Sequence, residues 1–266
     1  AKENPYDNMD VTWKNDTNEG LKILGIHFFT DYNVTIDFNY RQKIKTLKQV
    51  LQRWGQRALS KKGKALVINA LALSKLYHIA HTLPPPQWAV QEVNKTIGDF
   101  LWNTEANSLI KLKHLCRPTW EGGLALKNFT TQATALRLHL LAHVFNKSTD
   151  DTWTTFAKYW IGTHLKTIKP DMWQHLVDNN TPQNLILKDD DPPFYTDSIT
   201  YIKKHTALFT RLDTSDKYVH PTTKDIYNAI AAVELKHTTI PGPDYWNKVA
   251  RREVLDWNNT WISSYA

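Results

Sequence analysis

The stretch that decides the fold runs from Phe38 to Gln91 and reads FNYRQKIKTLKQVLQRWGQRALSKKGKALVINALALSKLYHIAHTLPPPQWAVQ. It holds ten basic side chains and no Asp or Glu. Residues 1–37 hold three basic and seven acidic side chains, and residues 92–266 hold twenty and nineteen. The positive net charge of the 266-residue chain, +7, therefore originates in this block. Such a concentration of one sign is typical of a surface that binds a polyanion.

The first part of the block has the period of an amphipathic helix. Its apolar residues recur at steps of four and three and cover one narrow sector: Tyr40, Ile44, Leu47, Leu51 and Trp54. Basic residues lie on both flanks of that sector: Arg41, Lys45 and Lys48 on one, and Lys43, Arg53 and Arg57 on the other. A solvated helix face is the alternative, but such a face normally mixes signs for i,i+4 pairing. The lack of carboxylates favours contact with phosphates.

A second helix is predicted to begin after Ser60, whose hydroxyl can accept a hydrogen bond from a free backbone N–H. Lys61, Lys62 and Lys64 fall in its first turn, where cations oppose the helix dipole at a cost of ~0.3–1 kcal/mol each. Lysines at this position indicate an external anion, such as a phosphate at the helix N-terminus. Three exposed lysines without a ligand are the alternative interpretation.

The next segment, 65–83, is apolar on almost every side and predicts a buried core helix. Its polar interruptions make it unsuitable for spanning a membrane. Two of these interruptions, His78 and His81, are expected to be buried and hydrogen-bonded. Three consecutive prolines from Pro84 end the helix. A third helix is predicted over 88–102.

Strand patterns are short and few. Branched and aromatic residues over 21–29 predict a strand, and 33–38 predicts either a short second strand or the entry to the first helix. Alternating residues over 109–115 and 124–129, joined by a glycine-containing turn, predict a small hairpin. Further helices are predicted over 131–146, 150–161, 224–236 and 245–261.

The composition limits the compartment and the chemistry. A single cysteine, Cys116, excludes an internal disulfide and a Cys-cluster zinc site. The polar, acidic first residues are not a signal peptide, so we expect an intracellular protein, nuclear or cytoplasmic, that is not secreted and does not bind a membrane. Because the first residue is Ala1, we expect the chain to be cut from a longer protein.

Six short motifs follow one another along the chain. They are Leu21-Lys22-Ile23-Leu24-Gly25-Ile26; Trp54 with Arg57-Ala58-Leu59-Ser60-Lys61-Lys62-Gly63-Lys64; Leu73-Ser74-Lys75-Leu76-Tyr77 with Leu83-Pro84; Phe100-Leu101-Trp102-Asn103; Pro118 with Gly122-Gly123-Leu124; and Asp256-Trp257 with Trp261. In this order they resemble the region after the palm in reverse transcriptases of LINE-type (non-LTR) retrotransposons. Ile23 stands where that family has an aromatic residue, and Ser74 where it has a proline. The resemblance is strongest over 21–124.

The resemblance implies a domain organisation. Residues 1–37 would be a remnant of the palm, with Leu24 and Gly25 near its primer-gripping hairpin. Residues 38–105 would be a basic helical thumb, and 106–266 a helical connector. The expected fold is mainly α, with a short N-terminal β element, a three-helix thumb-like bundle and a connector that contains the small hairpin.

The implied function is the grip of an RNA-directed DNA polymerase on its template–primer duplex. The duplex, RNA–DNA or DNA, would be held through its backbone phosphates and not read for sequence. Seven residues are predicted to make the contact: Arg41, Lys45, Lys48, Arg57, Lys61, Lys62 and Lys64. The other implied partners are the palm and fingers domains of the parent protein.

No catalytic residue is predicted within this chain, which is expected to be inactive alone. The family's metal-binding aspartates lie in an upstream (F/Y)-x-D-D motif, so magnesium is expected only in the palm and no cofactor in this chain. Asp150-Asp151 and Asp189-Asp190-Asp191 are better explained as cap or loop residues.

Three other functions remain open at this point. A helical module with a basic face could bind an acidic protein instead of nucleic acid. His139 and His143 have the i,i+4 spacing of two zinc ligands, but Leu140 stands where a metalloprotease has its glutamate. Cys116 and His114 could form a nucleophile pair, although nothing in the sequence orients them.

Overall fold

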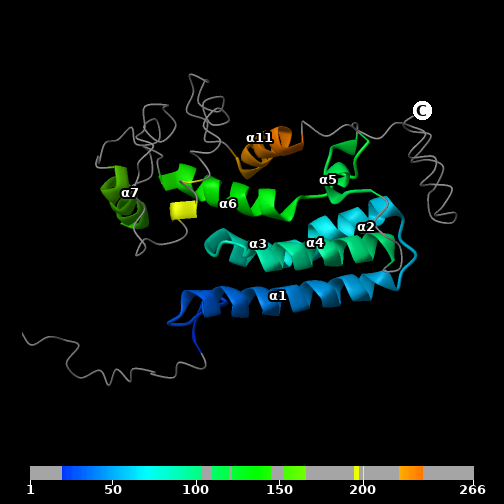
Figure 1. Ribbon diagram of the computed structural model, residues 1–266, viewed down its shortest axis with the longest axis horizontal. Coiled ribbons are helices and arrows are strands. Elements are labelled where there is room, and N and C mark those ends of the chain that lie inside the picture. The colour runs from blue at the N-terminus through cyan, green and yellow to red at the C-terminus, as the bar shows by residue number, and fades with distance from the viewer. Residues whose placement is uncertain are drawn as a thin grey trace, which may run out of the picture.

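The structure of this protein is a computed structural model. It describes residues 20–103, 110–119, 122–144, 152–165, 195–197, 200 and 222–235. In these residues the chain is mainly α-helical and has a short two-stranded sheet near its N-terminal end (Figure 1). The predicted fold class is therefore confirmed.

The N-terminal β element is a hairpin. Strand β1 (Leu21–Ile23) pairs antiparallel with β2 (Ile26–Phe28). Leu24 and Gly25 form the turn between them, with φ of 48° and 84°. Two consecutive residues with positive φ give the tight turn that matches the twist of the strands. The single strand predicted over 21–29 is thus wrong, because Gly25 lets the chain reverse in its middle.

Helix α1 (Tyr32–Gly55) begins before the predicted start at Phe38. The Asp31 carboxylate accepts hydrogen bonds from the amides of Asn33, at 2.7 Å, and Val34, at 3.4 Å. This cap satisfies backbone donors at the helix start and so favours helix over strand in the segment that follows. Of the two predictions for 33–38, the entry to the helix is confirmed and the strand is wrong.

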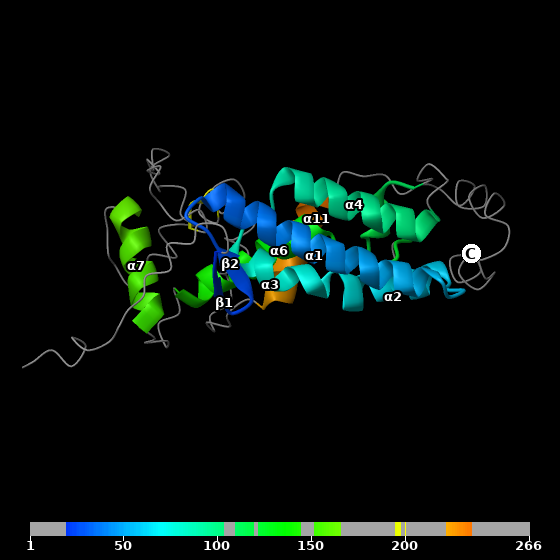
Figure 2. The same cartoon turned by 90° about the horizontal axis from the view of Figure 1, so that it is seen from below.

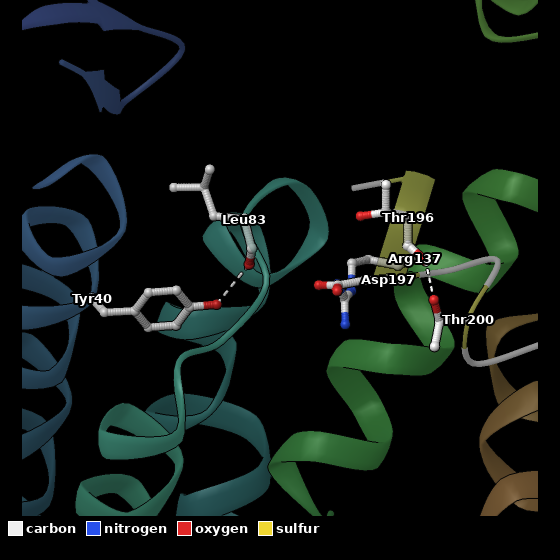
Figure 3. A network of polar contacts seen from close by, with 6 residues as sticks. All are labelled: Tyr40, Leu83, Arg137, Thr196, Asp197 and Thr200. Atoms are coloured by element: carbon white, nitrogen blue, oxygen red, sulfur yellow. Dashed lines mark hydrogen bonds and ion pairs between the residues drawn. The ribbon is translucent and has the colours of Figure 1, made fainter. Parts of the chain in front are cut away.

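The apolar seam of α1 faces the core, as predicted. Tyr40, Ile44, Leu47 and Leu51 are buried, and Trp54 is half-buried. The Tyr40 hydroxyl donates a hydrogen bond of 2.8 Å to the carbonyl oxygen of Leu83, which follows the end of helix α3 (Ser74–Thr82) (Figure 3). The bond satisfies a hydroxyl that burial would otherwise leave without a partner.

The core helix predicted over 65–83 is a continuous helical stretch of three parts. These are α2 (Lys61–Val67), a π-helical segment η1 (Ile68–Ala72) and α3 (Ser74–Thr82). The predicted N-cap is confirmed, because the Ser60 hydroxyl accepts a hydrogen bond of 3.1 Å from the Gly63 amide.

The π-helical segment contains Asn69, whose side chain contacts a distant part of the backbone. Its amide nitrogen donates to the carbonyl of Ala125 at 3.0 Å, and its oxygen accepts from the amide of Lys127 at 2.8 Å. The carboxamide therefore satisfies both a backbone acceptor and a backbone donor of this segment. A π-bulge inserts an extra residue and changes which side chains face a neighbour.

Helix α4 (Gln87–Trp102) follows the prolines and ends at Asn103, which has a left-handed conformation with φ of 58°. In the view of Figure 2, α1 lies in front, with α4 on one side and α2 and α3 on the other. Together they form the predicted bundle, in which one of the three members is the α2–η1–α3 stretch.

The predicted hairpin between 109 and 129 has no strands among the residues described there. A short helix, α5 (Leu112–Leu115), replaces the first strand. Hairpin-like pairing survives in the backbone: the amide of Leu124 donates to the carbonyl of Leu115 at 3.0 Å. The predicted positive φ of the glycine turn is confirmed at Gly122, with φ of 81°. Gly123 is required for another reason, since a Cβ there would lie 2.0 Å from the carbonyl oxygen of Arg117.

Three more helices agree with predictions: α6 (Phe129–Val144), α7 (Thr152–Leu165) and α11 (Thr223–Leu235). The helix predicted over 245–261 lies outside the described residues. One hydrophobic cluster includes described residues from Ile26 to Ala133, so residues from all three proposed domains share one core. The domain boundaries proposed from the sequence stay predictions.

Candidate nucleic-acid interface

Helix α1 is an outer element of the bundle. Figure 1 shows it along one edge of the molecule, with α3 and α4 between it and α6. Its buried seam fixes which side faces inward, so its two basic flanks and the surface between them face outward. Lys45 is exposed and, in the part of the chain that the structure describes, has no ion-pair partner.

The flank that carries Arg41 and Lys48 lies beside α4 and interacts with it. The Arg41 guanidinium lies 4.8 Å from the ring centroid of Trp88 and 3.7 Å from the Asp37 carboxylate. The Lys48 ammonium donates to the carboxylate of Glu92. Both cations therefore have carboxylate neighbours that reduce the charge they present to a ligand.

The Lys48–Glu92 pair remains accessible to water. The hydrogen bond from Lys48, together with its charge, holds the pKa of the Glu92 carboxyl below its usual range. Both side chains are partly exposed, and exposed ion pairs contribute only about 0.2–1 kcal/mol. Lys48 can exchange this partner for a phosphate at little cost.

Beyond the end of α1, Arg57 and Lys62 are exposed. The Arg57 guanidinium lies 4.3 Å from the centroid of the Trp54 ring, which positions the side chain while its N–H groups remain available. On the second flank, Arg53 is exposed and Lys43 is half-buried. These residues extend the basic surface from α1 towards the start of α2.

Lys61 and Lys64 do not face outward as expected. Lys64 is only 6% exposed, and its ammonium donates to the Asn103 side chain at 2.6 Å. The Lys61 ammonium donates to the carbonyl of Leu101 at 2.6 Å and lies 4.5 Å from the centroid of Trp102. The expectation of a solvent-facing Lys64 is therefore wrong.

The reason is the position of α4, whose C-terminus ends beside the start of α2. The last carbonyls of a helix carry partial negative charge and lack intrahelical partners. Both lysines donate to one of these carbonyls, that of Leu101, so the cost of placing cations at the start of α2 is offset within the fold.

Polar side chains that the sequence analysis missed hold the hairpin tip in place. Leu24 is 88% exposed, and its carbonyl accepts a 2.8 Å hydrogen bond from His78. Asn39 pairs with His27 of β2: it accepts from the His27 amide at 3.0 Å and donates to its carbonyl at 2.7 Å. The available signal was the polar Asn39 directly before Tyr40, the first residue of the apolar seam. His78 is hydrogen-bonded as expected but exposed, which corrects the expected burial.

Other predicted chemistry finds no support in the geometry. Burial raises the pKa of the Cys116 thiol to about 12, so a reactive thiolate is disfavoured. No cluster of three His, Cys, Asp or Glu side chains suited to a metal ion occurs among the described residues, and this holds for the surroundings of His139 and His143. Among the helices described here, none combines the length and apolar character needed to cross a bilayer.

Comparison with known proteins relates this chain to a transposon protein. No family model matches the chain. Over 154 residues it is 27% identical to a protein of transposon origin. That relative is the Transposon TX1 uncharacterized 149 kDa protein of Xenopus laevis, and the match covers 56% of this chain and 11% of the relative. The similarity supports a relation to transposon proteins.

Proposed function

We propose that this chain is the thumb and connector part of an RNA-directed DNA polymerase of the LINE type. In this proposal it grips the template–primer duplex through backbone phosphates and holds no catalytic aspartates. The palm and fingers of the parent protein would supply the active site and its magnesium. The proposed duplex contacts are Arg41, Lys45, Lys48, Arg57 and Lys62; Lys61 and Lys64 serve the end of α4 instead.

The observation that carries the proposal is the position of the carboxylate-free block. Its first helix is an outer element of the bundle, with its apolar seam facing the core and four exposed cations, Arg41, Lys45, Lys48 and Arg53. A rigid helix with a row of cations can neutralise successive phosphates and so release condensed counterions. The motif order and the similarity to a transposon protein support a duplex as the polyanion.

Charge reversal tests the proposed interface. We expect Lys45→Glu with Lys48→Glu to weaken binding to all duplex sequences alike. The slope of log K against log salt should become less steep by about 2, because two phosphate contacts are lost. The measurement is fluorescence anisotropy with labelled duplexes over a salt series. An unchanged slope would refute the role of these lysines.

Two controls separate charge from folding. Lys111→Glu with Lys113→Glu makes the same change in net charge at the start of α5, and should leave the slope unchanged. Lys48→Glu with Glu92→Lys exchanges the members of the ion pair and keeps the local charge. The exchange should bind nearly as well as the unmodified chain if the overall charge of this flank, not one contact, determines affinity.

A second candidate is a basic interaction module that binds an acidic protein. It is favoured by the intramolecular contacts of Arg41 and Lys48 with carboxylates, which show that this flank accommodates acidic side chains. Such a module would bind heparin as well as it binds a duplex. Competition between heparin and an RNA–DNA hybrid therefore discriminates the two functions.

A further inference from the structure

The outer face of the α2–η1–α3 stretch carries two exposed leucines with a lysine on either side. Lys62, Leu66, Leu71 and Lys75 are all exposed. Leu66 is 68% exposed and Leu71 is 37% exposed, and Ala70 beside them is exposed as well. Neither the core of the bundle nor the proposed duplex contacts use the exposed surface of the two leucines.

The π-helical segment aligns these four residues, which we call the Lys–Leu–Leu–Lys row. Steps of four, five and four residues separate its members. Four residues make about one turn of an α-helix, and five make about one turn where hydrogen bonds connect i to i+5. The 2.9 Å bond from the Leu73 amide to the Ile68 carbonyl is of this second kind. In an uninterrupted α-helix, Leu71 would be rotated by about 140° from Leu66 and would leave the row.

Contacts made by the π-helical segment hold the row in place. Asn69 is bonded through both ends of its carboxamide to the backbone of Ala125 and Lys127. These two hydrogen bonds fix the rotation of the segment about its axis and, with it, the outward position of Leu71. Short π-helical segments occur frequently at functional sites. The alignment is therefore built into the fold, and it suits a ligand that follows the row.

The row has an apolar centre and cationic ends. Leucine side chains gain free energy when they leave water, and contact with hydrated phosphates would not remove them from water. Lys62 and Lys75 lie one turn beyond the leucines, and neither is in an ion pair in the part of the chain that the structure describes. The row extends over about 20 Å of helix. Its complement is an apolar pair flanked by carboxylates at the same spacing.

We infer that the Lys–Leu–Leu–Lys row docks an acidic amphipathic helix of a partner protein. Apolar side chains of that helix would pack on Leu66 and Leu71, and its carboxylates would pair with Lys62 and Lys75. Docking of an amphipathic helix on an apolar surface is a common mode of peptide recognition, and the flanking charges determine which helix fits. The row adjoins the proposed duplex surface at Lys62. The inference is otherwise independent of the proposed function, because the leucines contact no phosphate.

The test measures binding of two synthetic peptides to the complete chain by isothermal titration calorimetry. Both are alanine-based and roughly 16 residues long, which is enough to form a helix. Each carries two leucines one turn apart, flanked one turn further out by glutamates in the acidic peptide and by lysines in the basic peptide. The glutamine variant is Leu66→Gln with Leu71→Gln. Leu21→Gln with Val233→Gln is the matched control, since these side chains are 64% and 44% exposed elsewhere.

We expect the acidic peptide to bind the unmodified chain at least about tenfold more tightly than the basic peptide, because only the former matches both lysines. The glutamine variant should lose about tenfold or more in affinity for the acidic peptide, and the matched control should lose none. Lys62→Glu with Lys75→Glu should reverse the preference between the two peptides. High salt should diminish the preference, because the lysines are exposed.

Equal affinity for the two peptides, no binding of the acidic peptide, or undiminished affinity of the glutamine variant would each overturn the inference. Self-association of the unmodified chain that the glutamine variant abolishes would also overturn it, because the row would then contact a second copy of the chain. The glutamine variant should keep the duplex affinity and salt slope of the unmodified chain, because its cations are unchanged. The duplex measurement therefore separates failure of this inference from failure of the proposed function.

Discussion

At the scale of single residues, whether a lysine is buried or exposed depends on the partner that the fold provides. Lys62 and Lys64 are two positions apart at the start of one helix, yet Lys62 is exposed and Lys64 is buried against the end of α4. The sequence predicted the helix start and its Ser60 cap. It could not predict that α4 would end there, because this depends on tertiary packing.

The two lysines should therefore respond differently to substitution. We expect Lys64→Met to lower the free energy of unfolding by about 1–3 kcal/mol, because Asn103 and the last carbonyls of α4 lose a buried donor. Lys62→Met should change it by less than about 0.5 kcal/mol. Urea unfolding measures both, and equal effects would show that Lys64 is not a structural residue.

Glycine-to-alanine substitutions test how closely the backbone packs at two positions. Gly123→Ala should destabilise the fold by about 3 kcal/mol, because the new Cβ would meet the carbonyl oxygen of Arg117, a backbone atom that cannot move cheaply. Gly98→Ala on α4 is the control. No atom lies within 4 Å of its added Cβ, so alanine should stabilise the helix by about 0.5–1 kcal/mol. Thermal unfolding distinguishes the two, and a tolerated Gly123→Ala would contradict the turn geometry.

At the scale of elements, periodicity predicted the long helices and missed their local irregularities. The seam of α1 and the helices α4 and α11 follow apolar spacing, which is a local property of the chain. The π-helical segment does not, because its Asn69 is held by the backbone of Ala125 and Lys127, more than fifty residues away. The hairpin turn at Gly25 was missed because branched and aromatic residues stand on both sides of it, which made 21–29 resemble one strand.

The contact between α3 and α6 makes stability depend on pH. Burial, followed by the charges of His139 and His78, lowers the pKa of His81. His81 is therefore neutral in the fold but takes up a proton in the unfolded chain near pH 6.5. Stability is fully present above that pH and decreases as pH falls through and below it.

We expect the free energy of unfolding to be lower at pH 5.5 than at pH 7.5, and His81→Gln to reduce this difference. The pKa of His114 is also lowered, by burial and by Arg117, so a part of the difference should remain in the variant. The window lies above the carboxylate range, which excludes the Lys48–Glu92 pair as a cause. Urea midpoints at both pH values give the answer; an unaltered difference in His81→Gln would contradict the assignment.

At the scale of the whole molecule, the same block of sequence supplies apolar residues to the core and cations to the surface. The carboxylate-free block contributes buried apolar residues to the shared core and presents its exposed cations on α1 and the turn that follows. The sequence predicted this basic surface from composition and helical period. Lys61 and Lys64 showed its limit, since their partners come from another helix.

The central claim is that this basic surface grips a nucleic-acid duplex through phosphates. The most direct measurement is the affinity of the complete chain for an RNA–DNA hybrid over a salt series, with heparin and single-stranded RNA as competitors. Five exposed cations predict a log–log slope of roughly −4 and a preference for the hybrid over both competitors. A slope near zero, or equal binding to heparin and to the hybrid, would contradict the claim.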